Sequence, residues 1–290
     1  MFIKSSQCRF FSVVAVFFIV ISSSAVSAER TLRFNYSEDA NGRYAVGLLK
    51  NALQRDTDFW KYESLDGEIS QARMIELVRS EKLDVMWAAT NKKMEKTLLP
   101  VRIPLYKGLL GHRIFIIHKN NQSRFDAIRE KDDFKNISMG QGTTWADTGI
   151  LLSNGFNVIK ANKYESLFYM VDGGRFDAFP RGVQEPWNEI SSRPELELTV
   201  EKNLMLIYRM PFYLFVSKNN ALLAQKLESG LREMIADGSF HDYFINDPTV
   251  QDVVEKSNLK NRLSFPLDNP TLPKETPINE AQLWLDPTQL

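Results

Sequence analysis

A glycine-rich turn carries the clearest chemical signal in the sequence. The run 140–144, GQGTT, follows a predicted strand and opens a predicted helix. Glycines let the backbone approach a ligand closely, and the free N–H groups at a helix N-terminus attract an anion. Thr143 and Thr144 could contact that ligand, or one of them could only cap the helix. The run lacks the third glycine and the lysine of nucleotide-binding loops, so it does not indicate a nucleotide.

Charged residues near predicted strand ends form a second candidate group. Arg113 begins a strand whose interior should be apolar, so its guanidinium must reach a ligand or a buried carboxylate. Arg181 follows another predicted strand, where it faces a ligand, points outward or pairs with Glu185 as a structural ion pair. Glu38 and Asp39 could hold a cationic ligand, but their positions fit solvated loop charges better.

Aromatic residues flank the same strand ends. Tyr36 and Trp87 follow or end predicted strands, where they either sandwich the apolar body of a ligand or pack in the core. Trp145 and Trp187 flank later loops and leave the same two interpretations open.

Common catalytic patterns do not occur. The sequence contains no Gly-x-Ser-x-Gly elbow and no His-Glu-x-x-His pair. His112 and His118 would share a strand face, but at about 3.3 Å per residue they lie roughly 20 Å apart, too far to bind one metal. We therefore expect no catalytic residue, no metal site and no cofactor.

Composition excludes further classes. The 290 residues include 36 Lys+Arg and 36 Asp+Glu, so the chain lacks the basic surface that nucleic-acid binding requires. With 43% hydrophobic residues it should fold, as one large domain or two smaller ones. Its only cysteine is Cys8, so no disulfide within the chain is possible.

The N-terminus resembles a secretory signal. Lys4 and Arg9 precede an apolar run over 10–21, and small residues lead to Ala28, after which we expect cleavage. An uncleaved membrane anchor is the alternative, but spanning a bilayer takes about 20 apolar residues. Cleavage would leave a thiol-free protein that suits the periplasm.

Strand and helix patterns alternate along the rest of the chain. Apolar alternation predicts strands at 31–36, 83–88, 113–118, 175–179 and 212–216, and helical spacing predicts helices at 68–80, 145–154, 164–172, 183–190 and 221–236. This rhythm indicates two α/β halves, each with a mostly parallel sheet flanked by helices. Ligands of such folds bind outside the carboxyl ends of the strands. We therefore expect a cleft between the halves.

Four ordered segments resemble one family. They are KLDVMWAAT at 82–90, IPLYKG at 103–108, GQGTT at 140–144 and GGRFDAF at 173–179. Together with DGSF at 237–240, their order and spacing resemble the bacterial periplasmic solute-binding proteins of the amino-acid class, known as solute-binding protein family 3. The match covers about 31–244.

The resemblance implies the type II periplasmic-binding fold, in which two lobes close on a ligand about two crossover hinge strands. Lobe one would comprise 29–118 and 213–260, and lobe two the inserted 119–212. The proline-rich tail 261–290 lies outside the family pattern, and we expect it to pack on lobe one.

Two positions depart from the family pattern. The arginine with which the family binds an α-carboxylate falls near Glu95, a few residues after the strand-end Thr90. The aspartate that accepts from the ammonium group falls at Arg181, which would repel it. A ligand that is acidic, or that lacks an ammonium group at that end, is therefore expected. The predicted ligand-binding set is Tyr36, Trp87, Thr90, Arg113, Thr143, Thr144, Trp145, Arg181 and Glu185.

The resemblance also implies a function. The leading hypothesis is a monomeric periplasmic protein that captures a small polar ligand for a membrane permease of the ABC type. The alternative is a detached sensor that reports to a membrane kinase or cyclase. A dehydratase on the same fold, with Glu185 or Asp147 as its carboxylate, is a third hypothesis.

Overall fold

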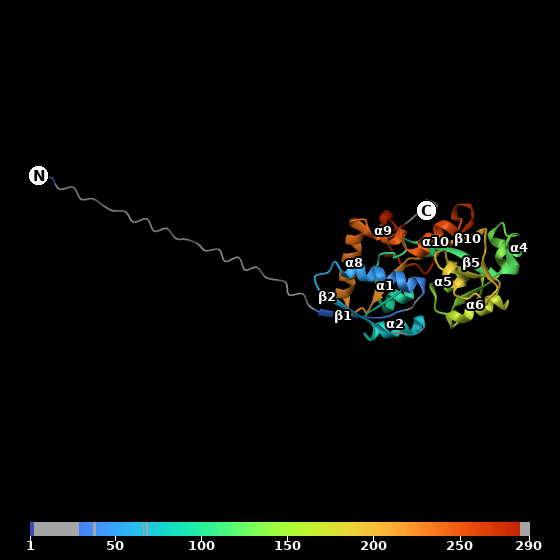
Figure 1. Cartoon of the computed structure of the whole chain (residues 1–290), viewed down its shortest axis with the longest axis horizontal. Helices are drawn as coiled ribbons and strands as arrows, with labels where there is room; N and C mark the ends of the chain where they lie inside the picture. The colour runs from blue at the N-terminus through green and yellow to red at the C-terminus, as the bar shows by residue number, and fades with distance from the viewer. Residues whose placement is uncertain (3–28, 37–38, 66, 68, 285–290) are drawn as a thin grey trace.

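The computed structural model describes residues 1–2, 29–36, 39–65, 67 and 69–284 (Figure 1). The predicted signal segment and Glu38 lie outside the described residues, so their interpretation stays a prediction. Among the residues that are described, no helix is both long and apolar enough to cross a membrane.

The first lobe is built on two small sheets that lie side by side. Parallel strands β1 and β2 form one sheet, and β11 pairs with β3 and β4 on its two sides in antiparallel fashion. The backbone N–H of Asp84 donates to Arg33 O over 2.8 Å and joins the two sheets. The strands are β1 (Glu29–Asn35), β2 (Phe59–Leu65), β3 (Val85–Ala89), β4 (Leu99–Val101) and β11 (Phe212–Val216). The helices are α1 (Ala40–Leu53), α2 (Gln71–Arg79), α3 (Lys92–Thr97), α8 (Ala221–Ala236) and α9 (Ser239–Ile245).

The second lobe contains the middle of the chain. Strand β5 pairs antiparallel with β8, β9 and β10, while β6 and β7 form a parallel pair. A bridge between Met139 and Ala178 connects β6 to the start of β8. The strands are β5 (His112–His118), β6 (Ser138–Gly142), β7 (Asn157–Ala161), β8 (Phe179–Gly182), β9 (Leu198–Val200) and β10 (Leu204–Ile207). The helices are α4 (Gln122–Phe125), α5 (Ala146–Ser153), α6 (Tyr164–Asp172) and α7 (Pro186–Ser191).

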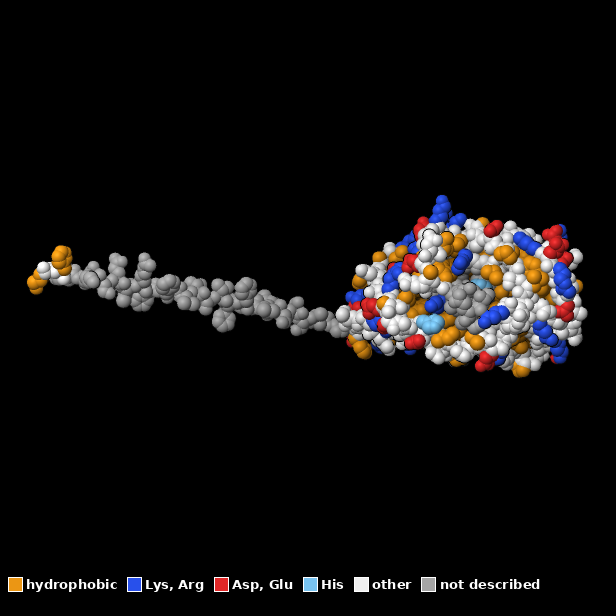
Figure 2. Space-filling view, turned by 90° about the horizontal axis from the view of Figure 1, so that it is seen from above, with side chains coloured by type: hydrophobic (Ala, Val, Ile, Leu, Met, Phe, Trp, Pro, Cys, Tyr) orange, Lys and Arg blue, Asp and Glu red, His pale blue; other side chains and the backbone are white. Residues whose placement is uncertain are grey.

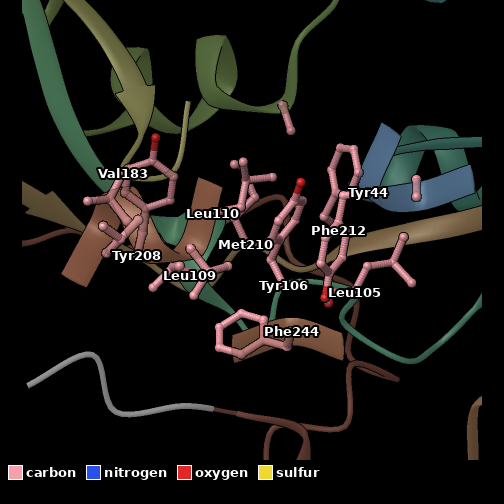
Figure 3. Close-up of a cluster of buried hydrophobic side chains, with 14 of the residues drawn as sticks. Tyr44, Leu105, Tyr106, Leu109, Leu110, Val183, Tyr208, Met210, Phe212 and Phe244 are labelled. Atoms are coloured by element: carbon pink, nitrogen blue, oxygen red, sulfur yellow. The ribbon is translucent and has the colours of Figure 1, made fainter. Parts of the chain in front are cut away.

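Apolar faces bury the helices against these sheets. Helix α8 buries Leu223, Leu227 and Leu231, and Gly230 lets α8 approach α1 so closely that a Cβ there would lie 2.1 Å from Ala52 O. A run of buried aromatic and aliphatic side chains continues from α1 into the crossing between the lobes, where Tyr106 stacks on Tyr44 at 4.1 Å (Figure 3). One core cluster thus extends through both lobes.

The C-terminal segment contacts both lobes. After α10 (Pro248–Lys256), strand β12 (Leu263–Pro266) pairs parallel with β10. The amide of Asn154, which directly follows α5, then donates to Asp268 O over 2.8 Å, and the backbone N–H of Lys92 in α3 donates to Thr271 O over 3.0 Å. On the face around the C-terminus, acidic and basic side chains are interspersed among apolar ones (Figure 2).

The predicted α/β fold with two lobes is confirmed, but the sheets are not mostly parallel as expected, because β11 pairs antiparallel with β3 and β4, and β5 pairs antiparallel with β8, β9 and β10. Individual elements also show local shifts. The pattern predicted a strand that ends at Phe179, but strand β8 begins there. Residues 175–177 form bends, and Ala178 makes only an isolated bridge to Met139. Helix α7 begins only at Pro186, since proline fits the first helical turn and not the interior. The exact lobe boundaries stay a prediction.

Candidate functional site

Two arginines enter the interior of the second lobe from neighbouring strands. Arg113 in β5 pairs with Gly182 of β8, and Arg181 pairs with the next residue of β5, Ile114. Arg113 is 2% exposed and Arg181 6% exposed. A guanidinium buried this deeply requires charged partners, since an unpaired buried charge is strongly destabilising.

Three buried carboxylates supply those partners. Arg113 Nη2 lies 2.7 Å from Asp147 Oδ1, and Arg113 Nη1 lies 3.3 Å from Glu185 Oε2. Arg181 Nη2 lies 3.2 Å from the same Glu185 oxygen and 2.5 Å from Glu189 Oε1. Arg181 Nε also donates to Glu189 Oε2 over 2.9 Å, so this pair is bidentate. We call these five residues the ion cluster.

Aromatic side chains complete the surroundings of the ion cluster. The Tyr164 hydroxyl donates to Glu189 Oε1 over 2.6 Å, and the Tyr208 hydroxyl donates to Asp147. The Arg181 guanidinium lies 5.1 Å from the ring centre of Trp145 and 4.9 Å from that of Phe179. These rings shield the charges from water and attract the cation through their faces.

The first lobe reaches the ion cluster through Asn41. Asp39 caps α1 by accepting from the Gly42 N–H, which fixes the first turn of the helix beside the second lobe. Asn41 Nδ2 then donates to Glu185 Oε1 over 2.6 Å. A second contact between the lobes joins the Thr144 hydroxyl to Gln71 Oε1 at 3.3 Å. Besides the apolar cluster around Tyr106, the lobes therefore meet through polar contacts at the ion cluster and beside it.

The electrostatics keep the arginines charged. Burial opposes the charged form of Arg181, but Glu185 and Glu189 outweigh it and raise its pKa well above the ordinary value. Burial raises the pKa of Glu189, although Arg181 acts in the opposite direction. Burial, together with the nearby Asp147, also raises the pKa of Tyr208, which keeps that hydroxyl a donor.

Several buried polar atoms around the ion cluster have no hydrogen-bond partner. Both amide atoms of Gln184 are unpaired, although this side chain is 1% exposed. Further unpaired atoms in this part of the described chain are Asn41 Oδ1, Tyr106 OH, Arg113 Nε, Gln141 Oε1 and Trp187 Nε1. Because buried polar groups are nearly always paired in folded proteins, such a concentration marks a place where another molecule can bind.

The structure brings some of the predicted site residues together. Arg113, Trp145, Arg181 and Glu185 contact one another in or beside the ion cluster. Sequence reasoning missed Glu189, Tyr164, Tyr208, Asn41 and Gln184. Glu189 lies four residues after Glu185, and this spacing was the signal that could have identified it.

The remaining predicted residues lie elsewhere. Trp87 in β3 packs against Phe34, with ring centres 6.2 Å apart, and Tyr36 packs at the edge of the core. Thr143 donates to Asn162 Oδ1 over 2.7 Å, and the N-cap position of α5 is held by Trp145, which makes no side-chain cap hydrogen bond. The suggestion that Thr143 or Thr144 caps this helix is therefore wrong.

Near Thr90, the first lobe carries an acidic residue with its own partner. The Thr90 hydroxyl donates to Glu95 Oε1 over 2.6 Å, and Arg102 forms an ion pair with the other Glu95 oxygen. The position at which the family resemblance implied a carboxylate-binding arginine therefore holds a paired carboxylate.

Solved structures with this fold include amino-acid-binding proteins. An ancestral arginine-binding protein bound to arginine aligns with 16% identity and a TM-score of 0.57, over 76% of this chain and 98% of that one. The ancestral amino acid-binding protein AncCDT-1, a precursor of cyclohexadienyl dehydratase, aligns with 15% identity and a TM-score of 0.56, over 75% of this chain and 95% of that one. A third structure comes from work on glutathione import through GshT and the cystine ABC importer TcyBC of Streptococcus mutans. It aligns with 12% identity and a TM-score of 0.58, over 76% of this chain and 95% of that one.

These likenesses confirm the fold that the four motifs predicted. No family model and no curated protein matches the sequence.

Proposed function

We propose that this chain is an exported solute-binding protein that captures a small polar ligand between its two lobes. The support comes from a fold shared with amino-acid-binding proteins and from the polar character of the junction between the lobes. The expected signal segment agrees with a role outside the cytoplasm.

The observation that carries the proposal is the set of unpaired polar atoms around the ion cluster. The junction also contains the apolar cluster around Tyr106, and stability alone would need nothing more, because replacing a buried ion pair by apolar residues is often neutral or stabilising. Here the junction retains five charged side chains and leaves the Gln184 amide without partners. This arrangement suits a ligand that completes the hydrogen bonding when the lobes close.

Binding fits the geometry better than catalysis. Each carboxylate of the ion cluster is held by an arginine at 2.5–3.3 Å, so none is free to act as a general base. We therefore assign Glu185 and Asp147 to holding the site together, and not to a dehydratase reaction.

The bound form would deliver its ligand to a membrane partner. We propose an ABC-type permease, and a membrane sensor is the alternative. Cross-linking of the closed protein in its native envelope, followed by identification of the attached membrane protein, separates the two.

Thermal denaturation with a panel of small solutes tests the binding function. A ligand should raise the melting temperature, by an amount that grows with its concentration, and should reduce the radius of gyration in solution scattering. If no compound changes either quantity, and no small molecule is released on denaturing the freshly purified protein, the proposed function is wrong.

A further inference from the structure

The charged groups of the ion cluster are paired with one another. Arg113 is shared by Asp147 and Glu185, and Arg181 is shared by Glu185 and Glu189. Glu189 receives further bonds from Tyr164, and Glu185 from Asn41 and the backbone N–H of Gly182. A carboxylate or ammonium group of a ligand would have to break one of these buried pairs before it found a partner.

Most of the groups that stay unpaired are neutral, in contrast to the charged groups of the ion cluster. Three of the residues that carry them bond to Glu185 or precede it in the chain. Asn41 and Arg113 both bond to Glu185 and keep Oδ1 and Nε unpaired, and Gln184 precedes it in the chain.

The Gln184 amide lies on the face of β8 that carries Gly182. A Cβ on Gly182 would lie 2.9 Å from Gln184 Oε1, so the glycine leaves room for this amide. The absent side chain at position 182 thus places an unpaired donor and acceptor beside the ion cluster.

Tyr106 lies shortly before β5, where the chain first passes from the first lobe to the second. Its hydroxyl at the junction has no hydrogen-bond partner. Its ring is fixed by stacking on Tyr44, and its hydroxyl points away from Phe244 at the base of the apolar cluster (Figure 3). Donors and acceptors are therefore both present, which suits amide, carbonyl and hydroxyl groups.

We propose that the ligand is electrically neutral and carries amide or hydroxyl groups, in contrast to a free amino acid with its two charged ends. This inference rests on the proposed function, and it specifies the ligand class for the same site. The Gln184 amide and the Tyr106 hydroxyl would bond to the ligand, while the ion cluster stays intact as the rigid floor of the site.

A pair of matched probes tests the ligand class. L-Glutamine and N-acetyl-L-glutamine amide share a side chain, but only the first is a zwitterion. Succinate and succinamide form a second pair that differs in charge and not in length. Thermal denaturation and calorimetric titration should detect binding of the two neutral compounds and at least tenfold weaker binding of the charged ones.

Two substitutions test the residues, each with a matched control. Tyr106→Phe removes a hydroxyl that has no partner in the protein, so it should leave the melting temperature of the free protein unchanged and weaken binding of the neutral probe by about tenfold. Tyr44→Phe removes a hydroxyl that donates to Leu105 O over 2.8 Å, and it should lower that melting temperature. Gln184→Met should also weaken binding, whereas the same change at the exposed Gln225 should have no effect.

The outcomes separate this inference from the function on which it rests. Tighter binding of glutamine or succinate than of their neutral partners overturns the ligand class and leaves the binding function standing. Unchanged affinity in both Tyr106→Phe and Gln184→Met places these groups outside the site and also overturns the inference. If neither pair binds, the small molecule released from the purified protein decides between the outcomes. Release of a charged compound contradicts the inference. If the protein releases no small molecule at all, both the inference and the proposed function are contradicted.

Discussion

At the scale of single residues, the buried pair of Arg181 and Glu189 has the clearest energetic consequence. The guanidinium and the carboxylate make two parallel bonds in a site shielded by aromatic rings. Removing one partner of such a pair leaves an uncompensated buried charge, which typically costs about 3–5 kcal/mol.

We therefore expect Arg181→Met to lower the free energy of unfolding by about 3–5 kcal/mol, measured by urea denaturation. Adding Glu189→Gln should recover at least half of this loss, because the amide still accepts from Tyr164 and carries no charge. Arg79→Met, which breaks an exposed pair with Glu76, should leave the urea midpoint unchanged. A double variant as unstable as the single one would show that Arg181 acts through packing.

The raised pKa of Glu189 gives this residue a defined effect on stability as a function of pH. Burial raises its pKa above the ordinary value of 4.5, so the folded protein holds this proton to higher pH than the unfolded chain does. The stability that this carboxyl contributes is fully present below about pH 4.5 and decreases as the pH rises through the folded-state pKa.

Glu189→Gln removes that titration. The unfolding free energy of the natural protein minus that of the variant should therefore be larger at pH 4 than at pH 7 in urea denaturation. Asp237→Asn should show the opposite sign, with the difference lost below pH 4, because hydrogen bonds from Ser239 and the charge of Arg55 lower the pKa of Asp237 to about 2. A difference for Glu189→Gln that does not change with pH would contradict the burial argument.

At the scale of elements, the contact between α1 and α8 depends on one glycine. Helix propensity alone would favour alanine over Gly230 by about 1 kcal/mol. However, a Cβ at this position would lie 2.1 Å from the backbone oxygen of Ala52, so the helices would have to separate.

Gly230→Ala should consequently destabilise the protein by about 1–3 kcal/mol, since overpacking outweighs the propensity gain. Ser229→Ala, one residue earlier on the exposed face of the same helix, serves as the control and should be neutral or slightly stabilising. Chemical denaturation of both variants provides the measurement. If Gly230→Ala proved as stable as the natural protein, the close approach of the helices would not be structurally important.

The sequence predicted most elements that have strong periodicity, and it failed where tertiary contacts decide. The long amphipathic helix at 221–236 was predicted with its exact bounds. Strand β2 was missed because its FWKYESL pattern shows little burial, with only Trp60 and Tyr62 partly covered.

The candidate site shows the same limit. Arg113 and Arg181 could be selected from sequence because a charged residue in an apolar strand needs a partner. Which partner each one finds depends on the turn from β8 into α7, which brings Glu185 and Glu189 back to Arg181. The contribution of Asn41, 144 residues away from Glu185, has no local signal in the sequence.

At the scale of the whole molecule, the C-terminal segment connects the two lobes outside the hinge. Asp268 accepts from Asn154, directly after α5 in the second lobe, and Thr271 accepts from Lys92 of α3 in the first. The two anchors are three positions apart in the chain, and an extended chain spans only about 3.5 Å per residue. The lobes can therefore separate at this edge by only a few ångströms before one anchor breaks.

Removing residues 268–290 should consequently shift the unliganded protein toward open forms. The chain from residue 29 onward contains no cysteine, so Gln71→Cys and Thr144→Cys together introduce the only two thiols, at side chains that meet across the lobes. We expect the disulfide to form several-fold more slowly in the truncated protein, because its thiols meet less often, and the radius of gyration from solution scattering to increase. Circular dichroism must show that the truncated protein remains folded. Equal rates of disulfide formation in the two proteins would mean that the tail only covers the surface, and that the hinge and the polar junction at Asn41 and Glu185 alone hold the lobes together.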